Sequence, residues 1–519
     1  MPLMASDAPN TRPHRLQVLD QFGRRKSLPD NPEQYQTLYK GNANILLLGV
    51  GPDPSVVDAL LQGCGDVVYL ECPELARQKS VAVHAAGPAH WRAISSADLD
   101  HFGASGRTIL FYRPGLSLFP DFWSSVLSRI ALQRCPPPKA QANSVVWLPA
   151  SEQRLLIREL TWAFTAQGMT VRHVPENLSP GEILCRLGDE RPGIFFSVNF
   201  QGLDPLGQNY GLLRNADVQV CVWCVDNPFH LLSGLRSAYW KQCRLFVTDD
   251  WFIPLLVDHG ATQPVHLPLA AAEHFLHPDS SMNPMQDWSD LAQSMVFVGR
   301  SAFPGKKRFF AGCAIPRELD SAAEAIMTKG ERPDFAWWRR HLSLRELWPG
   351  PGVRQIGFAA EEFSRRRRTE YLLAAQCTGK LTVFGDTQWR SLLPDTTDIR
   401  PEVDYYGPLA QIYRQARSTL NLTSLLLPHG LTQRHFDVWA ANGILLTDRT
   451  PGLNVFDPRL TSEIAFDTPA AMSALMHRLD SDSSLCNDLR DAWRSHILKH
   501  HRYTHRVATV LGTLTIPAF

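Results

Sequence analysis

The chain has 519 residues, of which 44% are hydrophobic and 20% are charged. Because this length exceeds what one hydrophobic core usually organises, we expect two or three domains. The 52 basic residues nearly cancel the 51 acidic ones, which excludes a strong overall attraction to nucleic acid or to anionic lipid. The composition is that of a soluble globular protein, neither disordered nor fibrous.

The N-terminal segment MPLMASDAPNTRPHRLQ lacks the apolar core of a signal peptide. No later segment approaches the roughly 18 apolar residues that a membrane helix needs. The ten cysteines are spread along the chain without dense clustering, which is typical of reduced thiols. We therefore expect a cytoplasmic protein without a membrane span.

A strand–helix–strand unit opens the ordered part of the chain. The buried-strand pattern NILLLGV leads into a turn with Gly49 and Gly51, the helical pattern PSVVDALLQG follows, and the strand DVVYLE ends at Glu71. A glycine turn with an acid 20 residues after Gly51 resembles the cofactor-binding start of Rossmann proteins or methyltransferases. The third glycine of the fingerprint is missing and prolines occupy the turn, so a nonbinding α/β domain is the competing interpretation.

Two further α/β units follow a proline-rich break at residues 135–138. Short apolar runs alternate with helical connectors in both units, which predicts parallel sheets covered on both faces. A polar stretch from His277 to Asp290 indicates a linker between them. We expect an extra N-terminal α/β domain over residues 1–140 and two Rossmann-like domains over residues 141–285 and 286–519.

Polar residues follow the apolar runs where each predicted strand ends. Ligands of open α/β sheets bind beyond the carboxyl ends of the strands, and two such edges that face each other would form a cleft. The candidates are Asn199, Asp226, Asp249, Asp250, Gly299, Arg300, Gly385, Asp386, Thr447 and Asp448.

Two features of the run QVCVWCVDNPFH compete for a chemical role. Cys221 and Cys224 have the spacing of a redox or metal pair, but they lie inside an apolar strand pattern, and no second such pair supplies further ligands. We interpret them as core cysteines. Asp226, before a rigid Asn-Pro turn, is our candidate for a general base, with His230 as a weaker one; binding and turn-capping roles for Asp226 stay open.

Several motifs together resemble the CgeB-like glycosyltransferases of the spore-maturation type. They are SVNFQG, VWCVDNPFH, LFVTDDWFIPLLVDHGATQPVHLPLAAAEHF, MVFVGR, VFGDTQW, VDYYGPLAQIYRQARSTLNLT, LTQRHFDVWAANGILLTD and HRYTHR, in the order of the family, over about residues 144–507. The resemblance implies the GT-B architecture, in which two Rossmann-like domains face each other, and transfer of a sugar from a nucleotide-sugar donor.

The resemblance also implies which residues hold the donor. Arg434 would stabilise the leaving phosphate, and Asp437 would either accept a ribose hydroxyl or position its helix. Gly443 would allow the turn into the next strand, with Asn442 tolerating a positive φ before it. The loop VGRSAFPGKKR would form a second phosphate grip through Gly299, Arg300, Lys307 and Arg308, and Gly385 completes the set of donor-binding candidates.

Two basic segments have structural interpretations instead. The run Arg365–Arg368 follows two glutamates and precedes an apolar stretch, which is typical of a solvated helix face. The segment HRYTHR, with His501, Tyr503, His505 and Arg506, is expected to lie on a final helix that packs back across the two domains.

We therefore predict a bacterial glycosyltransferase of the hexosyltransferase type, without a metal or cofactor, whose acceptor is a glycan or a protein and not a nucleic acid. One alternative is a methyltransferase-like or nucleotide-binding activity in the N-terminal domain, with S-adenosylmethionine held through Gly49, Gly51 and Glu71. The other is a noncatalytic scaffold that keeps the GT-B shape.

Overall fold

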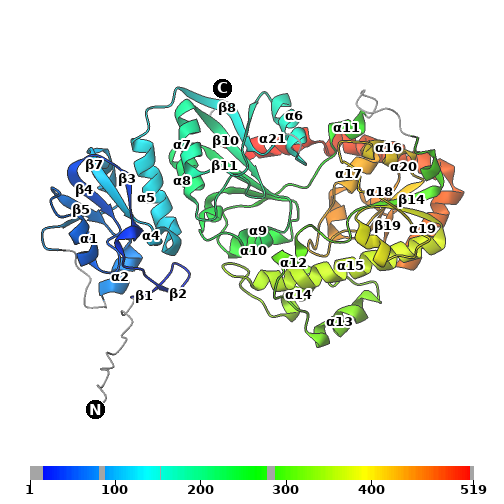
Figure 1. Cartoon of the computed structure of the whole chain (residues 1–519). Coiled ribbons are helices and arrows are strands. Elements are labelled where there is room, and N and C mark those ends of the chain that lie inside the picture. Colours follow the sequence, from blue (N-terminus) through cyan, green and yellow to red (C-terminus); the bar gives the residue numbers. More distant parts are fainter. Residues whose placement is uncertain (1–15, 81–87, 152–153, 278–286, 515–519) are drawn as a thin grey trace, which may run out of the picture.

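A computed structural model describes residues 16–80, 88–151, 154–277 and 287–514. In these residues three large sheets follow one another along the chain (Figure 1), with a small antiparallel pair, β1 (Gln17–Leu19) and β2 (Arg25–Ser27), beside the first. Residues 1–15, which the sequence analysis interpreted as lacking a signal peptide, lie outside the described residues, as do residues 278–286 of the predicted linker. No helix in the described ranges has the length and apolar character to cross a lipid bilayer.

The N-terminal sheet has the strand order β3-β7-β4-β5-β6, in which only β3 runs antiparallel to its neighbour. Its first strand–helix–strand unit is the one that the sequence predicts. The strands are β3 (Tyr35–Tyr39), β4 (Asn42–Leu48), β5 (Val67–Leu70), β6 (Arg92–Ala93) and β7 (Arg107–Tyr112), and the helices are α1 (Pro54–Leu60), α2 (Pro73–Ser80), α3 (Leu99–Ala104), α4 (Pro114–Leu118) and α5 (Pro120–Gln133).

The middle sheet is parallel throughout, in the order β13-β12-β11-β10-β8-β9. Cys221 and Cys224 are buried in its interior, as predicted for core cysteines, and burial raises the pKa of both thiols. The strands are β8 (Ala140–Pro149), β9 (Thr170–Val174), β10 (Glu190–Val198), β11 (Gln219–Cys224), β12 (Arg244–Val247) and β13 (Val265–His266), and the helices are α6 (Ile157–Ala166), α7 (Pro180–Asp189), α8 (Gln208–Asn215), α9 (Pro228–Leu232), α10 (Phe252–Asp258) and α11 (Glu273–Leu276).

The C-terminal sheet is also parallel, in the order β16-β15-β14-β17-β18-β19. Numbered along the chain this order is 3-2-1-4-5-6, that of a Rossmann sheet. The strands are β14 (Ser294–Val298), β15 (Lys380–Phe384), β16 (Asp398–Arg400), β17 (Ser418–Asn421), β18 (Leu445–Asp448) and β19 (Ala465–Phe466). The helices are α12 (Lys306–Phe309), α13 (Arg317–Met327), α14 (Phe335–His341), α15 (Gly352–Thr378), α16 (Leu409–Gln415), α17 (Arg434–Ala440), α18 (Pro458–Thr461), α19 (Pro469–Ser481), α20 (Ser483–His500) and α21 (Tyr503–Thr513).

The middle and C-terminal sheets meet through the loops at the carboxyl ends of their strands. The Asn227 side chain, after β11, donates to the carbonyl of Leu426, after β17, at 3.0 Å. The backbone N–H of His429, in the same loop as Leu426, donates to Asp249 after β12 at 3.0 Å. The predicted fold class is therefore confirmed: two Rossmann-like parallel sheets face each other in the GT-B manner, and an additional α/β sheet precedes them.

The last helix returns to the middle sheet. Helix α20 packs on α17 of the C-terminal sheet, whereas α21 lies against α6 of the middle sheet (Figure 1). Arg506 fixes this return because its guanidinium donates to the carbonyls of Pro268 and Leu269 at 2.8 and 3.0 Å. The backbone of His501 also accepts from Ala271 at 2.8 Å. These contacts agree with the structural interpretation of HRYTHR.

Candidate active site

Arg434 lies at the point where the strand order of the C-terminal sheet reverses. The chain moves outward from β14 in one direction and from β17 in the other, and ligands of such sheets bind outside this pair of carboxyl ends. As the first residue of α17, Arg434 donates from Nε to Asn421 and from Nη1 to the carbonyl of Val298, both at 2.7 Å. Its half-buried guanidinium thus bridges the ends of the two strands.

A second arginine, which the sequence analysis missed, reaches the same loop. Arg368 on α15 donates to the carbonyl of Ser301 at 2.9 Å and pairs with Glu361 at 3.4 Å. The Nε atom of Arg368 is buried and has no hydrogen-bond partner within the described ranges. Because Arg368 and Arg434 both approach the segment that follows β14, positive charge is concentrated at this end of the sheet.

A cavity of about 1050 Å³ opens beside this segment, beyond the ends of β14, β15 and β16. Its walls combine cations with three phenylalanine rings, a combination that suits a ligand with phosphates and an apolar or aromatic part. The lining residues that carry charge or rings are Arg300, Phe303, Lys306, Lys307, Phe310, Phe358, Glu362, Arg365, Asp386 and Glu402.

Only some of the residues predicted for the donor-binding loop line the cavity. Arg300 and Lys307 line the cavity, although Arg300 is paired with Glu402. Arg308 is exposed and does not line the cavity. The cavity lining therefore gives its assignment as a donor-binding residue no support, and that assignment stays a prediction.

Gly299 and Gly385 directly follow β14 and β15, and their backbones pack against each other. A Cβ atom on Gly385 would come within 2.4 Å of the Gly299 carbonyl and 2.8 Å of the Trp389 ring. Asp386 holds the two loops together because its carboxylate accepts from the backbone and the hydroxyl of Ser301, at 2.6 and 2.8 Å. The two glycines therefore allow close packing, and no side chain of theirs is available to a ligand.

The two other donor-binding candidates, Asp437 and Gly443, do not line the cavity. Asp437 is 1% exposed, and its carboxylate accepts from the backbone of Ala272 at 3.2 Å and from the hydroxyl of Tyr405 at 2.8 Å. Burial raises the pKa of Asp437 well above its usual range. These contacts, together with the burial of the carboxylate, support the helix-positioning role over the ribose-binding role, the two that the sequence left open.

Gly443 lies before β18, at the opposite end of the sheet from the cavity. A Cβ atom at this position would meet the Tyr413 carbonyl at 2.5 Å, so the glycine is required by packing and not by a ligand. Asn442 has a φ of 64°, which confirms that an asparagine takes the positive-φ place in this turn.

Asp226 lies at the carboxyl edge of the middle sheet, as predicted. Its side chain is exposed and accepts from the side chain of Asn199 at 2.7 Å, and Asn199 follows the neighbouring strand β10. Dense protein around the carboxyl raises the pKa of Asp226 by desolvation, and the bond from Asn199 opposes this shift. The residue is accessible to an acceptor, and its role as a base stays a prediction.

His230 is enclosed by aromatic rings, which favours a structural role over the predicted catalytic one. Its ring packs edge-on against Phe309, Phe310 and Phe335, and a Cβ atom on Gly357 of α15 would come within 2.1 Å of its Nε2 atom. Burial lowers the pKa of His230 to about 4, so the ring is neutral at physiological pH. His230 lies in the first turn of α9, where the side chain of Asn227 caps its backbone N–H. From this position the ring points into the aromatic cluster.

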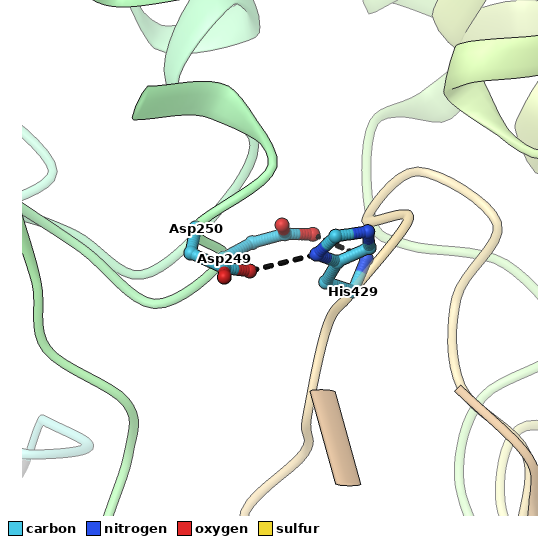
Figure 2. Close-up of side chains that lie close together, drawn as sticks. All are labelled: Asp249, Asp250 and His429. Carbon is cyan, nitrogen blue, oxygen red and sulfur yellow. Dashed lines mark hydrogen bonds and ion pairs between the residues drawn. The ribbon is translucent and has the colours of Figure 1, made fainter. Parts of the chain in front are cut away.

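Asp249 and Asp250 meet His429 across the two sheets, as Figure 2 shows. The Nδ1 atom of His429 lies 2.8 Å from Oδ1 of Asp250, and Asp249 accepts from the backbone N–H groups of Trp251 and His429 at 2.9 and 3.0 Å. Both aspartates follow a strand, as the sequence indicates, but nothing in the sequence pattern points to His429 as their partner. These three side chains are the one group in the described residues whose ligand atoms, all within 4.8 Å of one another, have the composition of a metal site.

The arginine run on α15 is half buried in the protein, which corrects the prediction of a solvated helix face. Arg367 is 4% exposed and pairs with the fully buried Asp448 at 2.7 Å. Arg365 and Arg366 remain partly exposed and pair with Glu362 and Asp320. Helix α15 contacts β15, α14 and α19, so successive side chains of the run face protein on more than one side.

The glycine turn of the N-terminal sheet does not fit S-adenosylmethionine. A Cβ atom on Gly51 would come within 2.0 Å of the Tyr35 hydroxyl, which itself donates to the Val50 carbonyl at 2.8 Å. Glu71 pairs with the buried Lys79 at 2.7 Å and also accepts from the backbone of Val50 at 3.2 Å. The protein's own side chains therefore cover the turn and occupy the acid.

Comparison with protein families gives one match: residues 361–512 match the glycosyl transferase-like family. The matched segment contains Arg368, Arg434 and β15 to β19, that is, most of the C-terminal sheet. This part of the chain is a glycosyltransferase-like domain, and the predicted class of enzyme is confirmed for it. No curated protein matches the chain.

Among solved structures, the chain is similar to a glycosyltransferase from Rickettsia africae, at 10% identity and a TM-score of 0.42 over 72% of this chain and 97% of the other. It is also similar to the T4 phage BGT in complex with UDP-glucose, at 8% identity and a TM-score of 0.42 over 73% of this chain and all of the other. The fold class itself is set by the strand orders described above.

Proposed function

We propose that the protein transfers a sugar, of the hexose type, from a nucleotide-sugar donor bound at the C-terminal sheet to an acceptor bound at the middle sheet. The observation that carries this proposal is the bridge between β14 and β17 that is made by Arg434, a residue of the segment that matches the glycosyl transferase-like family. Negative charge builds on the phosphate as the sugar leaves, and a fixed guanidinium stabilises it where it develops.

We further propose that the reaction needs no metal ion. Arg434 and Arg368 converge on the loop after β14, and Lys307 adds a third cation at the cavity. Preorganised cations of this kind can offset the charge of a leaving diphosphate without a divalent cation.

The finer assignment follows the motifs. We propose a CgeB-like enzyme of the bacterial cytoplasm that uses a glycan or a protein as acceptor and no nucleic acid. Residues 141–285 would serve the acceptor, residues 286–519 the donor, and residues 1–140 would form the additional domain.

A thermal-shift panel of UDP, GDP, TDP and CMP, their sugars and S-adenosylmethionine tests the proposal. A ligand that binds only the folded state raises the melting temperature. We expect one nucleotide family to stabilise the wild type, and Arg434→Lys, which keeps the charge but loses the fork, to weaken that binding roughly tenfold or more. Arg459→Lys, at an exposed residue paired with Asp457, is the matched control and should bind as the wild type does.

A shift with S-adenosylmethionine alone would contradict the proposal and favour the N-terminal domain. The absence of any shift, with the wild type folded, would favour a noncatalytic scaffold. EDTA treatment before the panel tests metal independence, because a shift that disappears with EDTA would contradict it.

A further inference from the structure

His429 is held on two sides by the middle sheet, although it belongs to the loop between β17 and α17 (Figure 2). Its backbone N–H donates to Oδ2 of Asp249 at 3.0 Å, and its Nδ1 lies 2.8 Å from Oδ1 of Asp250. Asp249 is 1% exposed and its other oxygen accepts from Trp251, so it is itself fixed. The position of the imidazole is therefore determined by both sheets.

These contacts also select the form of the ring. A carboxylate only accepts hydrogen bonds, so Nδ1 of His429 carries the proton and the lone pair is on Nε2. Nε2 has no hydrogen-bond partner in the part of the chain that the structure describes, and the side chain is 29% exposed. The lone pair is thus available to a molecule that binds between the two sheets.

The backbone below the ring is closely packed. A Cβ atom on Gly452 would come within 1.9 Å of the His429 carbonyl, and the hydroxyl of Thr450 donates to the Pro428 carbonyl at 3.2 Å. The ring therefore sits on a supported loop, and this loop continues directly into Arg434.

We propose that His429 is the general base of the transfer reaction and that Asp250 is its positioning residue. This inference rests on the proposed function. Nε2 takes the proton of the acceptor hydroxyl while the oxygen bonds to the anomeric carbon of the donor sugar. The bond from that carbon to the phosphate oxygen breaks at the same time, and its electron pair leaves with the nucleoside diphosphate, beside Arg434.

Two consequences follow. A single displacement inverts the configuration at the anomeric carbon. The base also requires both sheets, since Asp250 comes from the loop after β12 of one and His429 from the loop after β17 of the other. The catalytic pair therefore forms only where the two carboxyl edges meet.

Hydrogen bonding describes this cluster better than metal coordination. The distance of 2.8 Å between Nδ1 and Oδ1 is that of a charge-assisted hydrogen bond, and both oxygens of Asp249 hold backbone N–H groups. Two further titratable groups among the described residues face the pair. Burial raises the pKa of Asp249 to about 7, and the bonds from the backbone of Trp251 and His429 oppose this shift. Burial lowers the pKa of His266, at the end of β13; Asp250 opposes this shift, whereas Arg506 and His429 add to it. A metal remains one of the outcomes that the experiment distinguishes.

The test measures hydrolysis of the nucleotide sugar that gives the largest shift in the panel above, with water as acceptor. The proteins are the wild type, His429→Gln, Asp250→Asn, the double variant, and His477→Gln at an exposed histidine of α19 as control. We expect His429→Gln to lower kcat 10²- to 10⁴-fold, and Asp250→Asn to lower it by a smaller factor that does not multiply in the double variant. The affinity for the nucleoside diphosphate, measured by calorimetry, should stay within about threefold in all of them.

The pH profile separates a base from a merely structural residue. The wild-type rate should fall towards acid pH as the base is protonated, and His429→Gln should lose this fall. The released sugar should initially have the inverted configuration.

Unchanged kcat in His429→Gln, retained configuration, or a wild-type rate that EDTA abolishes and Mn²⁺ restores would each overturn the proposal. If Asp226→Asn removes the acid fall and His429→Gln keeps it, Asp226 is the base. If the wild type binds no nucleotide, the proposed function itself fails and the base assignment fails with it, whereas normal binding with unchanged hydrolysis rejects the base alone.

Discussion

Arg367 and Asp448 form an ion pair of 2.7 Å inside the C-terminal sheet, with side chains that are 4% and 0% exposed. Asp448 also pairs with Arg332 and accepts from the backbone and hydroxyl of Thr423 at 2.8 and 2.7 Å. Although burial raises the pKa of Asp448, the two arginines hold it below its usual value. One carboxylate thus anchors the beginning of the loop that carries His429.

We predict that Asp448→Asn lowers the free energy of unfolding by about 3–5 kcal/mol, because two buried guanidinium groups lose their counter-charge. Urea unfolding measures this loss. The double variant Asp448→Asn/Arg367→Met should recover part of it, since one of the unpaired charges is removed. Asp457→Asn, in an ion pair with the largely exposed Arg459, should show a much smaller loss, because asparagine can keep the N-cap of α18. An equal loss in both single variants would contradict the prediction.

Gly452→Ala should displace His429 without removing it. The added Cβ has no room beside the His429 carbonyl, so the loop must shift. A misplacement of this order lowers kcat roughly 10- to 100-fold while donor affinity changes little. Gly512→Ala on α21 has no atom within 4 Å of the new Cβ and is the matched control, with wild-type kinetics expected. A loss of donor binding as large as the loss of kcat would argue against this explanation.

The adjacent cations Lys307 and Arg308 should behave differently. Lys307 lines the cavity and Arg308 does not, although the sequence assigns both to the donor. Lys307→Ala removes one charge-assisted contact, for which we expect about a fivefold weaker Kd for the nucleoside diphosphate, less at high salt. Arg308→Ala should leave Kd unchanged in the same calorimetric titration. Equal effects of the two changes would place the phosphates outside the cavity.

Acid should destabilise the protein partly through His435. The ring is 1% exposed, the backbone N–H of Thr432 donates to its Nδ1 at 3.0 Å, and burial lowers its pKa to about 4 from a usual 6.5. The folded state then binds fewer protons than the unfolded state between these values, so stability is present above pH 6.5 and is lost as the pH falls towards 4. This residue contributes at most about 3 kcal/mol.

Urea unfolding between pH 4 and 7 measures that dependence. His435→Gln cannot be protonated and should flatten the curve, even if it lowers stability at pH 7. His477→Gln, on the exposed face of α19, should keep the wild-type slope. A slope that is unchanged in His435→Gln would show that other groups cause the acid loss.

The sequence was informative where function follows from local pattern. Arg434 was selected from the motif LTQRHFDVWAANGILLTD, and the structure places it at the first residue of α17, after β17. The positive φ of Asn442 followed from the turn that a helix needs before the next strand. For Asp437 and His230 the sequence could not decide the role, because polar residues near a strand end have the same pattern whether they face a ligand or the interior, and only packing distinguishes the two.

The alternation of apolar strands and helices determined the three α/β units by itself, because burial on both faces of a parallel sheet imposes a local periodicity that short segments already show. The tertiary structure alone decided which side chains meet. His429 and Asp250 are 179 residues apart and belong to different sheets, so their hydrogen bond depends on how the two carboxyl edges face each other. Likewise, whether an arginine of α15 faces solvent or Asp448 depends on the elements packed around the helix. The sequence of the arginine run does not show which of its side chains is buried.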